Sequence, residues 1–250
     1  MVEQILIGSC EHQRYRRAAQ LAMLEYFRYP IKMIDVAYGY HADFYDTSIV
    51  IDSLKNMGIK PRPLTPRYKY NISLTELKAR MLTRIIETGK NTIMVEDDHC
   101  LVISKSDLNN KLRNLTKKVD ISPEVIQMYP RKRNIDHPVI PIPEAEDFEH
   151  GCYGGGHLML FITPFGAEKL LEFMRDPKTP LSLENGMAKF LGNEPWIYSV
   201  VPDEKRNFVK SLEYIEGESI GIMLTKTGQE NRRTDERIER SKRIIEHFKL

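Results

Sequence analysis

Three consecutive carboxylates interrupt an apolar stretch in the middle of the chain, NTIMVEDDHCLVI at residues 91–103. Ile93–Val95 is a short apolar run typical of a buried parallel strand, and Glu96, Asp97 and Asp98 follow it directly. Like charges at the end of a buried strand are costly to desolvate. Mg²⁺ or Mn²⁺ relieves that cost and also takes phosphate oxygens. Because ligands of open α/β sheets gather at the carboxyl ends of strands, the pattern predicts a metal–phosphate site. A solvated acidic turn is the alternative.

A second group of candidates follows the first expected strand. Ser9 lies in the turn after that strand, and Arg14, Arg16 and Arg17 lie on the first turns of the helical stretch that follows. Cations at a helix N-terminus oppose the helix dipole, so their presence there favours an anionic ligand nearby. An anionic ligand is therefore expected near Ser9 and Arg14, and solvated arginines on a surface helix are the alternative.

A glycine-rich segment, HGCYGGGH at residues 150–157, is the third candidate. Consecutive glycines let backbone approach a ligand closely, which predicts ligand contacts at Gly155 and Gly156. A flexible hairpin is the alternative. His157 is interpreted as a substrate contact rather than a core histidine because glycines surround it in the sequence.

Strands and helices are expected to alternate, which predicts an α/β fold with a mostly parallel sheet. The expected strands are Gln4–Gly8, Ile31–Val36, Ile93–Val95, Val125–Tyr129, Leu158–Ile162 and Ile197–Val201. The expected helices are Gln13–Phe27, Asp43–Met57, Ser73–Thr88, Ser106–Leu115, Pro164–Arg175, Leu183–Leu191 and Thr234–Phe248. Ser73 and Glu76 have the spacing of a capping box, and Pro130–Glu149 is expected to be a long polar loop.

Composition excludes several classes of protein. The formal net charge of +2 gives little evidence about charged partners. Three scattered cysteines, Cys10, Cys100 and Cys152, favour neither a disulfide framework nor a zinc site and suggest a reducing, cytoplasmic location. Residues 1–10 lack the pattern of a signal peptide, and no apolar run is long enough for a membrane span.

The order of these motifs resembles GT-A glycosyltransferases, and most closely glycosyltransferase family 25, the lipooligosaccharide and collagen galactosyltransferase group. The matching segments are TELKARMLTRIIETGKNTIMVEDD, GGGHLMLFITPFGAEKLLE, TPLSLENGMAKFL and IYSVVP. They cover most of Ile5–Pro202 and together imply a GT-A fold, a mixed and mostly parallel sheet flanked by helices with a Rossmann-like nucleotide-binding half. Arg84 stands where the family has a histidine, and the family's N-terminal R-x-x-R is displaced into QRYRR.

The resemblance implies sugar transfer from a nucleotide donor, most simply a UDP-sugar, to an acceptor hydroxyl. Glu96 and Asp98 have the D-x-D spacing of a Mn²⁺ or Mg²⁺ site. Asp97 should point elsewhere if the strand continues, and is expected to hold ribose or sugar hydroxyls. Glu184 matches the family's late acidic position and is predicted to be the general base of an inverting reaction, with a carboxylate placed for the helix dipole as the alternative. Ser9 and Arg14, at the end of the first strand, and Arg84 are expected to contact the nucleotide donor.

The acceptor is expected to be a glycan or a lipid-linked saccharide. Hydroxymethylated DNA is the alternative, favoured by basic residues at 62–69, 131–133 and 232–243. A metal nuclease and a non-catalytic sugar-nucleotide binder are further alternatives. Residues 1–222 are expected to form one catalytic domain and residues 223–250 a basic helical extension.

Overall fold

The fold was analysed in a computed structural model that describes residues 1–11, 14–40, 45–60, 68–130, 139–153, 159–176, 178, 183–202 and 208–211. The expected helix Thr234–Phe248, the extension 223–250 and the three basic segments all lie wholly or almost wholly outside these residues. The domain boundary predicted at residue 222 therefore stays a prediction.

Short strands and amphipathic helices alternate along the described chain. The strands are β1 Gln4–Ser9, β2 Ile34–Tyr38, β3 Thr92–Glu96, β4 His99–Leu101, β5 Val125–Gln127, β6 Ile140–Pro141, β7 Phe148–His150, β8 Met159–Ile162, β9 Ile197–Val200 and β10 Val209–Ser211. The helices are α1 Arg14–Tyr26, α2 Thr47–Asn56, α3 Tyr68–Thr88, α4 Lys105–Lys118, α5 Pro164–Arg175 and α6 Leu183–Gly186, with a 3₁₀ turn at Ile31–Met33 and a π-helical turn at Met187–Leu191.

Eight strands form one mixed sheet in the order β2-β1-β3-β8-β5-β9-β7-β6. The pairs β1/β2, β1/β3 and β5/β9 are parallel, whereas β8 and β7 run antiparallel to their neighbours. Six strands therefore point in one direction and two in the other. The predicted α/β class with a mostly parallel, mixed sheet is confirmed, and the arrangement is compatible with a Rossmann-like fold.

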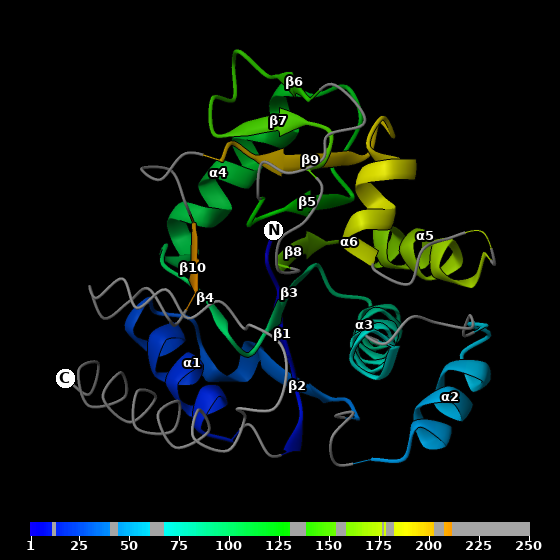
Figure 1. The fold of residues 1–250 in the computed structure, drawn as a ribbon. Helices are drawn as coiled ribbons and strands as arrows, with labels where there is room; N and C mark the ends of the chain where they lie inside the picture. Colours follow the sequence, from blue (N-terminus) through cyan, green and yellow to red (C-terminus); the bar gives the residue numbers. More distant parts are fainter. Residues whose placement is uncertain are drawn as a thin grey trace.

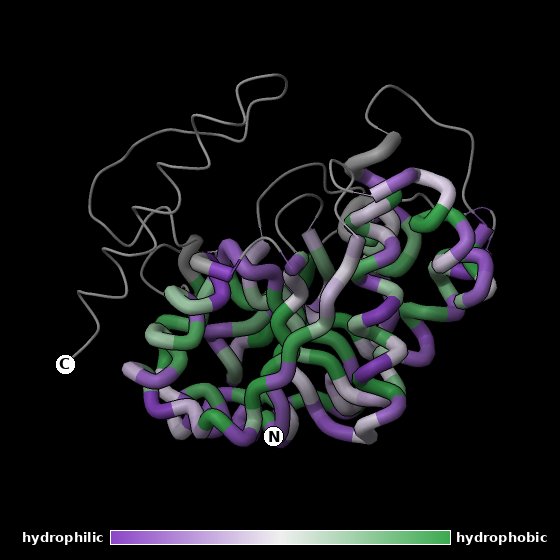
Figure 2. The backbone as a smooth tube through the Cα atoms, turned by 90° about the horizontal axis from the view of Figure 1, so that it is seen from below, coloured by the Kyte–Doolittle hydropathy of each residue, from purple (hydrophilic) through white to green (hydrophobic). Residues whose placement is uncertain are grey.

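Helices cover both faces of the sheet, with α1 and α4 on one side and α2, α3 and α5 on the other (Figure 1). Alternating side chains of β1 explain the two layers, because Ile5 and Ile7 join the core under α4 while Leu6 joins the core under α3. Hydrophobic segments lie mainly inside the molecule and hydrophilic ones mainly at its periphery (Figure 2).

Two predictions of where an element begins are wrong, one for the strand β2 and one for the helix α3. Ile31–Met33 forms a 3₁₀ turn after Pro30 rather than the beginning of a strand, because the Met33 amide donates back to the Pro30 carbonyl (2.9 Å). Ser73 is not a helix cap, since α3 begins at Tyr68 and Ser73 is buried within it. Glu76, the other half of the supposed capping box, instead accepts a hydrogen bond from Ser53 on α2 (2.7 Å).

Tertiary pairing adds strands that the sequence pattern did not predict. β6 and β7 lie within the expected loop Pro130–Glu149, and β10 follows the strand that was expected to be the last. β10 pairs with β4 in a separate two-stranded sheet directly after the acidic residues. In the part of the chain that the structure describes, no helix is long and apolar enough to cross a membrane.

The start of α5 offers a test of how closely this helix packs against Glu124, the residue before β5. Thr163 caps this helix as predicted, and its hydroxyl accepts from the Gly166 amide (3.1 Å). A Cβ at Gly166 would lie 2.4 Å from the backbone carbonyl oxygen of Glu124. Gly166→Ala is therefore expected to lower the free energy of unfolding by about 2 kcal/mol in urea titrations. Glu168→Ala, on the exposed side of the same helix, should change it by less than about 0.5 kcal/mol. Equal effects would contradict this packing.

Candidate functional site: the acidic turn between β1 and β3

The acidic residues lie at a point where the order of the sheet reverses. The chain leaves β1 through α1 to reach β2 on one side, and returns through α2 and α3 to β3 on the other side of β1. α1 and α3 accordingly lie on opposite faces of the sheet, on either side of the strands β1 and β3 (Figure 1). Gly8 pairs with Glu96 and Ser9 with Tyr38, so these ends are level. Such a reversal is where open α/β sheets bind ligands.

Asp97 joins β1, β3 and α1 through its side chain. The Ser9 hydroxyl donates a short hydrogen bond to Oδ2 of Asp97, and the Arg16 guanidinium lies 3.4 Å from Oδ1. Asp97 and Ser9 are both buried. Burial raises the pKa of the Asp97 carboxyl, Arg16 and Ser9 lower it, and Asp98 and Glu96 raise it further, to a net value of about 6. Asp97 thus links the acidic turn to β1 and α1.

Glu96 faces the opposite side of the sheet from this contact, toward α3. Its Oε1 lies 3.6 Å from Nζ of Lys78, a lysine whose side chain is only 4% exposed. Gly8 makes this approach possible, because a Cβ there would lie 2.5 Å from Sδ of Met81 on the same helix. The missing side chain lets α3 pack directly over the end of β1, and this close approach brings Lys78 to the acidic turn.

Asp98 is supported by the residue that follows it. Nδ1 of the buried His99 lies 2.6 Å from Oδ1 of Asp98, and the nitrogen carries the proton because an ionised carboxylate only accepts. Gln20, fully buried on α1, fixes the backbone of this turn at both ends. Its side-chain amide donates to the carbonyls of Glu96 (3.2 Å) and His99 (2.6 Å).

The three carboxylates therefore point to different partners, although not for the predicted reason. The strand ends at Glu96, and Asp97 and Asp98 form a turn rather than a continued strand. Asp97 faces Ser9 and Arg16, so its side chain points away from the partners of Glu96 and Asp98, as was predicted. Its side chain is only 9% exposed and contacts Ser9 and Arg16, so Asp97 organises the turn. Its expected contact with ribose or sugar hydroxyls stays a prediction.

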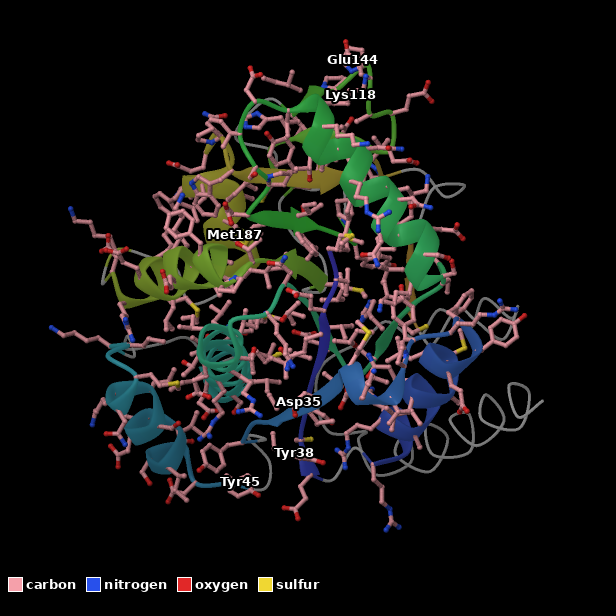
Figure 3. All side chains as sticks on the ribbon, turned by 180° about the vertical axis from the view of Figure 1, so that it is seen from behind. Asp35, Tyr38, Tyr45, Lys118, Glu144 and Met187 are labelled. Carbon is pink, nitrogen blue, oxygen red and sulfur yellow. The ribbon has the colours of Figure 1, made fainter. Side chains whose placement is uncertain are left out.

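Two further predicted nucleotide contacts, Arg84 and Arg14, lie on α3 and α1. Arg84 is half exposed on α3 and pairs with Asp35 (2.9 Å) and Glu87 (3.6 Å). Asp35 pairs with Leu6, three residues before the end of β1, and lies on β2 (Figure 3). Arg84 thus pairs with residues outside the acidic turn, and its predicted contact with the donor stays a prediction. Arg14 is exposed at the start of α1, and its predicted contact stays a prediction.

Other predicted site residues cannot be placed. Gly155, Gly156 and His157 lie outside the described residues. The backbone of Glu184 lies in the short helix α6, where a short helix was predicted. Its side chain is outside the described part of the structure. The structure does bring Ser9, Glu96, Asp97 and Asp98 together.

Four residues complete the site that were not predicted as ligand contacts: Arg16, Arg17, Gln20 and Lys78. The first two belong to the group of arginines in the first turns of α1, where helix-dipole reasoning already indicated an anion. Lys78 and Gln20 carried no comparable signal, because a polar residue within an amphipathic helix is ordinarily solvated.

A divalent cation fits the chemistry of this turn. Glu96 and Asp98 are each partly accessible, with side chains 16% and 15% exposed. Asp98 also has the hydrogen-bonded support that metal-binding carboxylates have. Across the described residues, no group of three or more histidine, cysteine or acidic side chains has the geometry of a metal site. Glu96 and Asp98 could each offer a carboxylate oxygen to a cation that is also bound by substrate phosphates, the usual mode for Mg²⁺.

Comparison with family models and with curated proteins finds no match to this chain. The activity of the site must therefore be inferred from its residues and their geometry.

The buried Lys78–Glu96 pair can be tested through stability. Lys78→Met leaves a poorly solvated carboxylate without its cation and is expected to lower the free energy of unfolding by about 3 kcal/mol. In the Lys78→Met/Glu96→Gln double variant, part of that loss should be recovered because the carboxylate is gone. Lys55→Met is the control, since Lys55 is 60% exposed in its pair with Asp52, and should cost less than about 0.5 kcal/mol. If the effects of the Lys78→Met and Glu96→Gln single changes, measured in urea titrations, add up to the effect of the double variant, the pair is not coupled.

Proposed function

We propose that the chain is a metal-dependent glycosyltransferase of the GT-A type that moves a sugar from a nucleotide donor, most simply a UDP-sugar, to an acceptor hydroxyl. One observation carries the proposal. An E-D-D turn lies at the β1–β3 reversal, with Arg16 and Lys78 beside it. Carboxylates that can hold a cation, next to fixed positive charge, suit a diphosphate. The mixed sheet and the motif resemblance support glycosyl transfer over other phosphate chemistry.

The reaction needs two devices from the protein. The bond between the anomeric carbon and the diphosphate oxygen breaks, and the acceptor oxygen bonds to the same carbon. When bound at Asp98 and Glu96, Mn²⁺ or Mg²⁺ would supply positive charge to the departing diphosphate. A general base must take the acceptor proton, and we assign this role to Glu184. With the base on the face opposite the diphosphate, the transfer inverts the anomeric centre.

The fixed cations have a distinct task. Arg16 and Lys78 lie on α1 and α3, which flank the reversal on opposite faces. They keep the carboxylates from repelling one another and add positive potential where diphosphate charge grows. Asp97, bonded to Ser9 and Arg16, keeps the turn in place as that charge develops.

The proposed acceptor is a glycan or lipid-linked saccharide. The test is to incubate the purified protein and Mn²⁺ with labelled nucleotide sugars, each paired with an oligosaccharide, with hydroxymethylated DNA or with unmodified DNA. Transfer to the oligosaccharide is expected. Transfer that requires the hydroxymethyl group would replace the proposed acceptor by a DNA base. If a nucleotide sugar binds but no label is transferred and no nucleoside diphosphate is released, the chain is a binder and not an enzyme.

A further inference from the structure

Tyr38 is an aromatic residue held at the ligand-binding edge of the sheet, yet 52% exposed. It is the last residue of β2 and pairs with Ser9 at the end of β1, and it lies at the β2 edge of the molecule (Figure 3). β2, β1 and β3 are consecutive strands, so Tyr38 is about 10 Å, or two strand spacings, from the acidic turn. Burial of an apolar core does not explain this ring.

Arg17 supports one face of the Tyr38 ring. Its guanidinium carbon lies 5.0 Å from the ring centroid. Its Nη1 donates to the Ser9 hydroxyl (2.9 Å) and, over a short distance, to the Cys10 carbonyl, and its Nη2 donates to the Glu11 carbonyl (3.2 Å). Both terminal nitrogens are therefore used within the turn that connects β1 to α1. A planar cation fixed in this way keeps the ring in place.

We propose that Tyr38 is the stacking platform for the base of the nucleotide donor, and that Arg17 is a positioning residue for it and not a phosphate ligand. The inference rests on the proposed function, since it places the base of a donor whose diphosphate lies at Asp98. The ribose and the α-phosphate span the interval from Tyr38 across β1 to β3. Stacking on an aromatic side chain is tolerant of base identity, so specificity for one base must come from other contacts.

The assay compares a nucleoside diphosphate with the same diphosphate without a nucleoside. UDP, CDP, GDP, ADP and inorganic pyrophosphate are titrated calorimetrically in the presence of Mn²⁺. Tyr38→Ala is expected to weaken the tightest nucleoside diphosphate by about 10- to 100-fold and to leave pyrophosphate unchanged. Tyr38→Phe, which keeps the ring, should retain the affinity. Tyr26→Ala is the control, because Tyr26 is similarly exposed (49%) at the far end of α1, and it should change neither ligand.

Arg17→Lys separates positioning from phosphate binding. Lysine keeps the charge but has neither the fork nor the planar face, so nucleoside diphosphate binding should weaken several-fold while pyrophosphate binding stays the same. Equal weakening of both ligands would overturn the positioning role. Nucleoside diphosphate binding that Tyr38→Ala leaves unchanged would overturn the platform. If the wild-type protein binds none of the four nucleoside diphosphates, whether or not it binds pyrophosphate, the proposed function on which the platform depends is overturned instead.

Discussion

Asp98→Asn is expected to lower turnover of the nucleotide sugar by about 10³-fold or more while the protein stays folded. Asparagine keeps the shape of the side chain and still accepts from Nδ1 of His99, the contact seen at 2.6 Å. It lacks the negative charge that a divalent cation requires. Release of the nucleoside diphosphate, followed at saturating Mn²⁺, measures the loss, and thermal unfolding shows that the variant is folded.

The control for this change is Asp52→Asn, which removes an exposed carboxylate on α2 paired with Lys55. It should retain full turnover. Excess chelator should reduce the wild-type rate to the level of Asp98→Asn, because both treatments remove the same positive charge. An Asp98→Asn protein with full activity, or wild-type activity that chelator does not change, would contradict the metal assignment.

Glu184→Gln is expected to lower turnover by about 10²-fold and to leave donor binding unchanged, because glutamine keeps the shape but cannot take the acceptor proton. The measurement is the turnover rate with saturating acceptor, together with UDP affinity by calorimetry. Glu168→Gln, which removes an exposed carboxylate from the nearby helix α5, is the matched control and should have no effect on either quantity.

An unchanged rate in Glu184→Gln would move the base elsewhere. Asp147 is a poor substitute because its Oδ2 is already paired with Nζ of Lys111, at 2.5 Å. Glu149 accepts a short hydrogen bond from the Tyr153 hydroxyl and lies on β7, within the main sheet. Glu149→Gln would then be the next variant to assay.

Buried strands and capped helices could be predicted from the sequence because local and tertiary preferences agree there. β3 is a continuous apolar run, and α5 has Thr163 and Pro164 in the positions that start a helix. The short strands β6, β7 and β10 could not be predicted in this way. Each has two or three residues, too few for a periodic signal, and depends on a partner that is distant in sequence.

Ser73 shows how a valid local signal can mislead. Its spacing to Glu76 is that of a capping box, but α3 begins earlier, at Tyr68. Glu76 is fully buried and binds Ser53 and Arg80. The acidic residue therefore serves the packing of α2 against α3, a tertiary role that local spacing does not encode.

Within the site, the position of the acidic turn could be predicted from sequence, but the direction of each side chain could not. Arg14, Arg16 and Arg17 are equivalent as first-turn cations, and only the rotation of α1 against the sheet decides that the last two face Ser9 and Asp97. Arg84 lies on the same helix as Lys78, but about two turns away, and that distance places it near Asp35 instead of the turn.

The most direct test of the central claim is a crystal structure of the protein soaked with UDP and Mn²⁺. The account predicts electron density for the diphosphate at the carboxyl ends of β1 and β3, with Mn²⁺ about 2.1 Å from a carboxylate oxygen of Asp98 and the uracil ring against Tyr38. Well-ordered UDP and Mn²⁺ bound at another place on the molecule, with the acidic turn still held only by its own contacts, would contradict it.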